Sequence, residues 1–590
     1  MKQFKFLVLF AVLTIVSVSG CGRRDTGEEA VEGSVLDYSG LSIEEEDYEY
    51  GSRVMPAREE IYENLALLGK VWGFVKYTHL SFITGQLDWD EELLALVPLV
   101  LEGGDVRAIL YDWFVGLGDS GYGNTVEHDE ALRQVADLSW LDYGYLGPLA
   151  AHLQRFDGIA TEVRDGAPMF FNAFGIPNFS NQNVLNPPAM RFARPEYRLL
   201  GLFRVWNAVK YFFPHHHALD VEWNEKLTEF VPMMLEGTDR LSYMATLQKL
   251  SHHLQDGIVQ FFEMPFFEET FGRYVAPVQL VAAEGRLVVY YVPHGNVELQ
   301  RGDVILTVNG RDIEEIIQEL RPFISYPKEN RVLACIAGIW LWEAGTGYVR
   351  SHALRSHTHG IYIEVLRGVF GTTLRVLGST THRVFHPQTM EPYVILDYNI
   401  GLINHSMHED VRQIMQSLAD TDGIIVDFRG LRHTMLGPVM REYLMEEPLP
   451  ENKMSFPALS FPGMFTDTIL FNPFEENQYT FNFDRPVVFL MDEQSNGLTE
   501  RVIMLLRAAP NVTVIGENSI GSGGIHATLP VPGGFFMIFK CMGLYTLDGG
   551  QTFRVGLAPD IRVERTVAGI REGRDEIMDA AIAFILGNLN

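Results

Sequence analysis

A strand that turns directly into a helix, near the C-terminal end of this 590-residue chain, is the feature that most constrains the fold. The apolar run Val487–Met491 is followed by the turn 493–500, which leads into a helix that continues through Leu506. Buried strands that alternate with helices indicate an α/β core. A side chain at this turn would stand over the first amides of the helix, where negative charge is stabilised. The chain has Gly497 there, which has no side chain.

The same alternation runs through the segment 381–590. Strands are predicted at 394–396, 400–403 and Gly423–Asp427, with a helix between the last two at 409–418. We therefore expect an α/β domain at the C-terminal end of a multidomain chain, since 590 residues are too many for a single core.

Composition excludes several classes of function. The formal net charge of −30 argues against binding nucleic acid, or an anionic membrane surface, through the folded domains. No spacing of metal ligands is present, and neither a metal nor a cofactor is predicted. Cys335 and Cys541 could pair, but nothing in the sequence shows that they do.

The N-terminus has the layout of an export signal. Basic residues precede the apolar run 6–16, and small residues precede Cys21, an ending that resembles a bacterial lipoprotein signal at 1–20. A plain signal peptide and a transmembrane anchor are the alternatives, although the apolar run is short for a span. With lipidation at Cys21, residues 21–55 would form an acidic tether holding an exported protein on the cell envelope, at the periplasmic face or the outer membrane.

The first half of the chain contains an internal duplication. Trp72 and Trp206 lie 134 positions apart, and the same shift relates Trp89 to Trp223. Helical spacing of apolar residues predicts helical repeats at 56–155 and 196–274, joined by an ordered linker at 156–195, with the tryptophans as core anchors. Between Trp206 and Trp223, the three histidines 215–217 are expected to form a surface turn, because consecutive side chains point in different directions.

The middle segment 275–380 resembles a PDZ domain. Strands are predicted at 287–292 and Val304–Val308, a helix at Ile313–Leu320 and a further helix at 334–342. The resemblance rests on the segment 299–310, with its Gly-Asp pair and Asn-Gly turn. PDZ domains bind a peptide as an extra strand at a sheet edge. The resemblance therefore implies peptide-binding residues, here Leu299, Gly302, Ile305 and Ile313.

Four ordered motifs resemble those of the tail-specific, or carboxyl-terminal processing, serine peptidases and their tricorn-core relatives. They are Asp427–Gly430, Gly516–Gly521, Gly556–Ile561 and Gly573–Glu576. The helical repeats, the PDZ-like segment and this core come in the family's order. The resemblance implies a C-terminal α/β protease core of the ClpP/crotonase type.

The chain departs from the family at the positions that carry its chemistry. The nucleophilic serine, three residues before Glu500, is replaced by Gly497. A histidine base after Asp-Gly is replaced by Ile258, and a lysine base by Ser522. The glycines of the oxyanion hole correspond to His433 and Thr434. Glycine cannot attack a carbonyl and isoleucine cannot accept a proton, so the resemblance implies a fold that has lost efficient proteolysis.

The sequence leaves three hypotheses, which differ in whether the protein cleaves peptides, only binds them, or does neither. Ser495, Ser519 or Ser522, with His526, could form a relocated catalytic group, although loop serines beside glycines are usually turn formers. The first hypothesis is a pseudoenzyme, a lipoprotein that binds peptides or unfolded protein ends. The second is an active serine endopeptidase with relocated groups, and the third is an envelope scaffold that binds nothing.

Overall fold

The computed structural model describes residues 58–588, apart from 124–125, 127–130, 160–165, 173–174, 293–297, 328, 338, 344–345, 380–390, 405–409, 430–435, 446–449, 451 and 471–480. Arg58–Asn590 form one compact unit. The signal, the tether and Cys21 lie outside the described residues. Among the described helices, none combines the length and the apolarity that a bilayer span requires.

Two sets of three helices make up the first half of the described chain. They are α1 (Arg58–Thr78), α3 (Trp89–Leu101) and α4 (Val106–Gly116), then α7 (Pro195–Phe212), α8 (Trp223–Glu236) and α9 (Arg240–His252). Trp72 Nε1 donates a hydrogen bond to Trp89 O at 2.7 Å, and Trp206 Nε1 donates to Trp223 O at 2.8 Å. Trp72 and Trp206 are fully buried, so each tryptophan anchors its first helix to its second.

Helices α1 and α7 approach closely because α1 has glycines at the contact. Asn207 Nδ2 donates to Gly69 O at 3.0 Å. A Cβ atom on Gly73 would lie 1.8 Å from Asn207 Oδ1, so only glycine fits at that position. The two sets of helices are therefore packed directly against each other.

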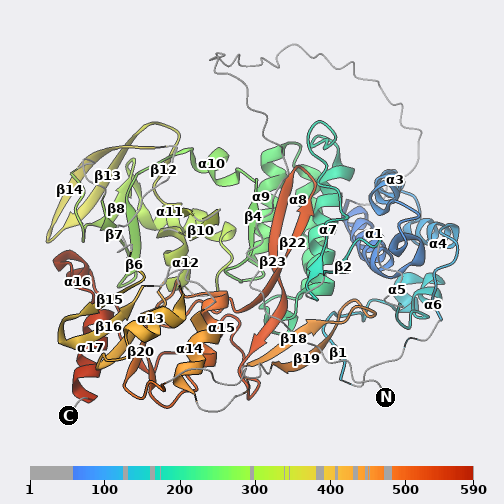
Figure 1. Ribbon diagram of the computed structural model, residues 1–590. Helices are drawn as coiled ribbons and strands as arrows, with labels where there is room; N and C mark the ends of the chain where they lie inside the picture. The colour runs from blue at the N-terminus through green and yellow to red at the C-terminus, as the bar shows by residue number, and fades with distance from the viewer. Residues whose placement is uncertain are drawn as a thin grey trace, which may run out of the picture. The chain divides into compact units, whose positions relative to one another are not determined.

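An antiparallel sheet joins the helices to the C-terminal half of the chain. Its strands are β1 (Arg133–Gln134), β19 (Met464–Leu470), β18 (Asn452–Pro457), β23 (Phe535–Tyr545) and β22 (Gly524–Val531), with β4 (Gln260–Phe262) also paired to β23. The long strands β22 and β23 run beside α7 (Figure 1). Tyr243 on α9 donates to Pro532 O at 2.8 Å, at the turn between them. Apolar side chains of both strands belong to the same core as the helices.

The middle segment is built on a second sheet. Its order is β14 (Phe370–Leu377), β13 (Gly360–Arg367), β8 (Val304–Val308), β7 (Arg286–Tyr291) and β6 (Gln279–Ala283), with β9 (Arg311–Asp312) beside β8. Helices α11 (Ile313–Leu320) and α12 (Glu329–Ala337) pack on it, and α12 contacts the edge strand β6. The helix predicted at 334–342 is wrong beyond Ala337, because β10 (Ile339–Glu343) pairs with β11 (Thr346–Arg350) as a hairpin.

The C-terminal segment has the predicted α/β form. Four parallel strands form its centre, β16 (Ile400–Ile403), β17 (Gly423–Asp427), β20 (Val487–Met491) and β21 (Val512–Gly516), flanked by β15 (Tyr393–Leu396) and β24 (Ile561–Arg562). One face is covered by α13 (Val411–Ser417), α14 (Leu436–Leu444) and α15 (Gly497–Leu506), and the other by α17 (Glu576–Asn588). Both faces are buried, which explains the uninterrupted apolar runs.

The shorter elements connect these layers. They are α2 (Leu80–Ile83), α5 (Tyr143–Leu146), α6 (Leu149–Leu153), β2 (Phe170–Phe171), β3 (Pro177–Asn178), η2 (His216–Ala218), α10 (Phe266–Phe271), β5 (Tyr274–Val275), η3 (Arg321–Phe323), β12 (Arg355–Ser356), η4 (Asp397–Asn399) and α16 (Val567–Glu572).

The histidines 215–217 lie at a turn, as the sequence predicted, with His217 exposed and His216 half-buried, but His215 is not at the surface. His215 is fully buried and stacks on Phe553, with ring centroids 4.4 Å apart. Its Nδ1 lies 3.3 Å from Tyr545 OH, and burial holds its pKa well below the ordinary value. His215 is covered because Tyr545 of β23 and Phe553 of the following loop pack against it, which local sequence could not show. Among the described residues, no cluster of His, Cys, Asp and Glu could hold a metal ion.

The contact between α1 and α7 gives a direct test. Gly73→Ala should destabilise the protein by about 1–3 kcal/mol, because the new methyl group collides with Asn207. Gly116→Ala, at the exposed end of α4, meets nothing within 4 Å and should stabilise it by up to about 1 kcal/mol. Urea unfolding monitored by tryptophan fluorescence measures both. Equal effects of the two substitutions would contradict this packing.

Candidate functional site

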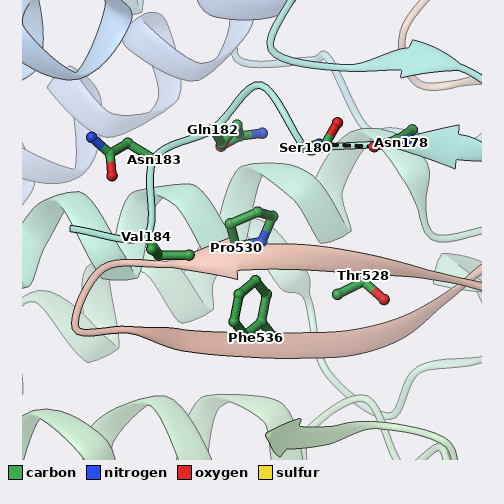
Figure 2. A pocket seen from close by; sticks show the side chains of 8 residues that line it. All are labelled: Asn178, Ser180, Gln182, Asn183, Val184, Thr528, Pro530 and Phe536. Atoms are coloured by element: carbon green, nitrogen blue, oxygen red, sulfur yellow. Dashed lines mark hydrogen bonds between the residues drawn. The ribbon is translucent and has the colours of Figure 1, made fainter. Parts of the chain in front are cut away.

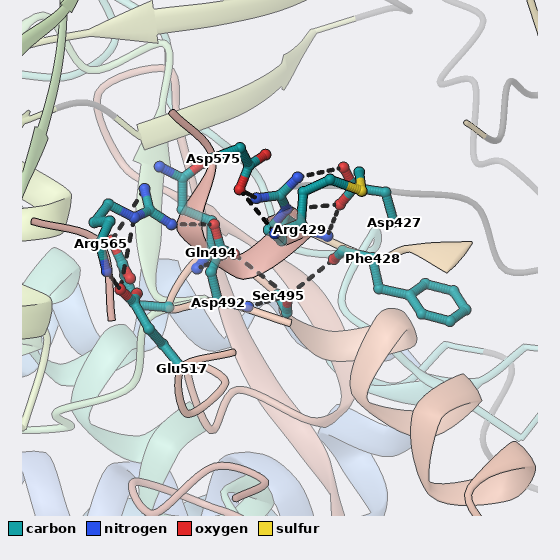
Figure 3. A network of polar contacts seen from close by, with 11 residues as sticks. Asp427, Phe428, Arg429, Asp492, Gln494, Ser495, Glu517, Arg565 and Asp575 are labelled. Carbon is teal, nitrogen blue, oxygen red and sulfur yellow. Dashed lines mark hydrogen bonds and ion pairs between the residues drawn. The ribbon is translucent and has the colours of Figure 1, made fainter. Parts of the chain in front are cut away.

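The turn between β20 and α15 is fastened to the neighbouring strand. Ser495 N donates to Asp492 O at 3.0 Å, and Asp492 N donates to Ser495 Oγ at 3.1 Å. The Ser495 hydroxyl itself donates to Phe428 O, at the end of β17, at 2.9 Å (Figure 3). Ser495 is fully buried. Its proton is therefore used to hold the turn, and its oxygen is not presented to a substrate.

Gly497 begins helix α15 immediately after this turn. Its φ of +41° lies in the left-handed region, and a Cβ atom built on it would meet nothing within 4 Å. Gly497 N donates to Ser522 Oγ at 3.3 Å. The positions where the resemblance implies a nucleophile and a lysine base thus lie side by side, occupied by a glycine and a buried serine.

Glu500 ties the first turn of α15 to the loop that precedes β22. Its Oε1 accepts hydrogen bonds from Ser519 Oγ at 2.5 Å and from Gly521 N at 2.7 Å. Ser519 Oγ in turn accepts from Leu557 N at 2.7 Å. Burial raises the pKa of Glu500, although these hydrogen bonds and two nearby cations oppose the shift. Ser519, like Ser495, is a structural hydroxyl.

A buried ion pair holds the Asp-Gly turn 256–257 near helix α15. Lys540 Nζ on β23 lies 3.4 Å from Asp256 Oδ2, without hydrogen-bond geometry, and both side chains are almost completely buried. Burial raises the pKa of both Asp256 and Glu500, and the Lys540 ammonium opposes both shifts, so it acts on both carboxylates. Asp256 Oδ1 accepts from Ile258 N at 3.3 Å. Ile258 is part-buried and packs against the main core.

An arginine from the middle segment braces the same loops. Arg331 on α12 is almost fully buried and donates to four backbone carbonyls. Two of them belong to Ser519 and Ile520, and the other two, at 2.9 Å, to residues 554 and 555. The loop that carries Ser519 is therefore fixed from two sides, by Glu500 and by Arg331.

The remaining family-like motifs form ion pairs beside the turn (Figure 3). Arg429 Nη2 lies 2.9 Å from Asp427 Oδ2, and its Nη1 lies 2.7 Å from Asp575 Oδ1. Arg565 Nη2 lies 2.8 Å from Asp492 Oδ2, at the start of the turn. These charges link β17, the turn and the start of α17, which is a structural role.

Two groups of predicted site residues remain. His526 is exposed on β22, directly opposite Lys540, and no hydrogen bond in the described part of the chain joins it to Ser495 or Ser519. His433 and Thr434 lie outside the described residues. The sequence reasoning did not single out Lys540 or Arg331, because a lone basic residue in an apolar strand or helix has no local signature.

The structure does not present the predicted peptide-binding residues to an open edge. Leu299, Ile305 and Ile313 are buried in the core of the middle segment. A Cβ atom on Gly302 would lie 2.5 Å from Arg571 Cβ, so α16 covers that position. Strand β8 already pairs on both sides, because it lies between β13 and β7.

The buried Glu500 carboxyl predicts a pH dependence of stability. Because the folded pKa of Glu500 is raised above 4.5, the contribution of this carboxyl to the free energy of unfolding is fully present below pH 4.5. It is lost as the pH rises through the folded pKa. Glu500→Gln cannot ionise, so its melting temperature should gain on the wild type from pH 4.5 upward. Melting curves between acidic and neutral pH measure this. A difference that stays constant over this pH range would contradict the raised pKa.

Comparisons with known proteins bear on the segment that holds the site. A model of peptidase family S41 matches residues 461–563. No curated protein matches the chain. Similar solved structures include mature CPAF (11% identity, TM-score 0.48, 66% of this chain and 97% of that chain). Another is the photosystem II D1 C-terminal processing protease, with 15% identity and a TM-score of 0.38 over 62% of this chain and 93% of that chain. A third is the tricorn protease, with 12% identity and a TM-score of 0.32 over 67% of this chain and 37% of that chain. The segment from β19 to β24 is therefore similar to peptidase family S41.

Proposed function

We propose that this member of peptidase family S41 binds peptides or unfolded protein ends and cleaves them with little or no efficiency. The observation that carries the proposal is the contact between Gly497 and Ser522, where the family resemblance implies a serine and a lysine. Glycine has no nucleophilic atom, and a serine hydroxyl is a much weaker base than a neutral lysine amine.

The second possible base position supports the same reading. Ile258 has no group that can accept a proton, and Asp256 beside it is engaged with Lys540 in the protein interior. Loss of nucleophile and base from a unit that acts together leaves at most weak assistance from binding and backbone dipoles.

An active peptidase with relocated groups is less well supported. Ser495 donates to a backbone carbonyl and Ser519 donates to a carboxylate. Ser522 Oγ accepts from Gly497 N, so its hydroxyl lies directly at the position that the family uses. It is therefore the residue on which a test of catalysis should concentrate.

An open sheet edge in the PDZ-like segment could receive a peptide. Strand β14 is the last strand of its sheet in the described part of the chain, and edge strands offer unpaired backbone groups to an added strand. The hairpin that it forms with β13 exposes Val369 and Phe370 by 82% and 75%, and Tyr362 and Leu377 by about half. Natural proteins rarely leave so apolar an edge uncovered, which favours peptide binding over an envelope scaffold that binds nothing.

The predicted acyl anchor completes the proposal. Lipidation of Cys21, followed by the acidic tether, would keep the protein on the bacterial cell envelope. Metabolic labelling with a palmitate analogue tests this, with Cys21→Ala as the variant that should lose the label.

The absence of catalysis can be measured directly. The purified protein should hydrolyse neither casein nor peptides with apolar C-termini, because Gly497 offers no nucleophile. For the same reason it should form no adduct with a serine-directed phosphonate. Ser522→Ala and Ser495→Ala should leave any background hydrolysis unchanged, as should Ser417→Ala on the exposed surface. Turnover that disappears with Ser522→Ala or Ser495→Ala, and persists with Ser417→Ala, would overturn the non-catalytic reading.

The open edge predicts where peptides bind. Phe370→Lys and Leu377→Lys should each weaken binding of a fluorescent unfolded peptide roughly tenfold, because burial of a large apolar side chain contributes about 1.5–3 kcal/mol. Lysine also protects edges from strand addition. Fluorescence polarisation measures the affinity, and Val115→Lys, on exposed α4, is the matched control. Unchanged affinity in both edge variants would place the binding surface elsewhere.

A further inference from the structure

We propose that a hollow between the loop 178–184 and the β22–β23 hairpin binds a neutral saccharide. The hollow measures about 400 Å³, within the range of small-molecule sites. Figure 2 shows the hairpin on one side and the loop on the other. This site is separate from β14 and from Gly497, and it goes beyond the proposed function.

The floor of the hollow is apolar and contains an aromatic ring. Pro530 on β22 and Phe536 on β23 lie directly opposite each other in the strand pair. Phe536 is part-exposed, so its ring is available to a ligand. The C–H face of a sugar ring packs on such a surface, because an aromatic ring carries negative charge on its face.

The rim presents hydrogen-bonding groups in fixed orientations. Asn178 Oδ1 accepts from Ser180 N at 2.8 Å, and Asn183 Oδ1 accepts from Leu185 N at 2.9 Å. Since each amide oxygen is held by backbone, each Nδ2 group is the one left for a ligand. Ser180 and Thr528 add exposed hydroxyls, which donate and accept. This combination suits sugar hydroxyl and ether oxygens.

The charge of the hollow selects the class of ligand. None of the described residues that line it is charged, although the chain carries a formal net charge of −30. A second hollow of about 480 Å³ shares Asn183 and contains Asp88 and Trp89, but neither lysine nor arginine among its described residues. Phosphate and other anions therefore meet no cation among the described residues that line either hollow.

A peptide fits this hollow less well than a saccharide. Strand β3 contacts the free side of β22, and Pro530 has no backbone N–H to donate. Addition of a peptide as a further strand is therefore blocked, and recognition must come from side chains. Hydroxyl groups that donate and accept match those side chains.

Binding of chitotriose and maltotriose to the full protein, by titration calorimetry and saturation-transfer NMR, tests the proposal. At least one of the two should bind. Thr528→Val should weaken that binding roughly 2- to 10-fold, the usual effect of one hydrogen bond. Phe536→Leu should weaken it as well by removing the aromatic face. Thr373→Val, an exposed strand threonine on β14, is the matched control and should bind normally.

Three results would overturn the proposal. The first is that neither trisaccharide binds, and the second is that Thr528→Val leaves trisaccharide binding unchanged. The third is that acetyl-trialanine-amide binds more tightly than either trisaccharide and that Thr528→Val weakens this peptide binding. Thr528 is exposed, so its variant keeps the fold even if Phe536→Leu does not, and a melting curve checks this. Because peptide binding at β14 is measured separately, failure here leaves the proposed function standing.

Discussion

Burial of strands β22 and β23 against helix α7 is the contact on which the rest of the structure depends. Side chains such as Leu529 and Phe539 share one core with the helices of the first half of the chain. Hydrophobic burial of this extent fixes the two halves relative to each other. It also carries Lys540 on β23 to Asp256, which lies 284 positions earlier in the chain.

The site is strongly organised although its expected chemical groups are missing. Glu500 and Arg331 fix the loop of Ser519 from opposite sides, and the Arg429 ion pairs fix the end of β17. Most of the family-like motif residues thus have structural roles that do not need a nucleophile.

The sequence predicted the elements whose signal is local. Strands β17 and β20 and helix α11 were predicted with their observed bounds, the strands from short apolar runs in an alternating pattern and the helix from the PDZ resemblance. The adjacency of Gly497 and Ser522 could be inferred only from the family resemblance. Spacing along a chain does not fix distance across a fold.

The errors share one physical cause. Most of β10 was predicted as helix, because short apolar runs do not distinguish a strand from a helix. His215 was taken for a surface residue, because nothing local shows that Phe553 and Tyr545 cover it.

By itself, the sequence determined the α/β character of the C-terminal segment and the absence of a side chain at Gly497, since both are properties of residue type and short-range pattern. Only the tertiary structure decided which sheet edge stays open, which serine hydroxyls donate hydrogen bonds to the backbone, and which charges are paired in the interior. Those outcomes depend on contacts between segments far apart in the chain, and burial and hydrogen bonding are settled by such contacts.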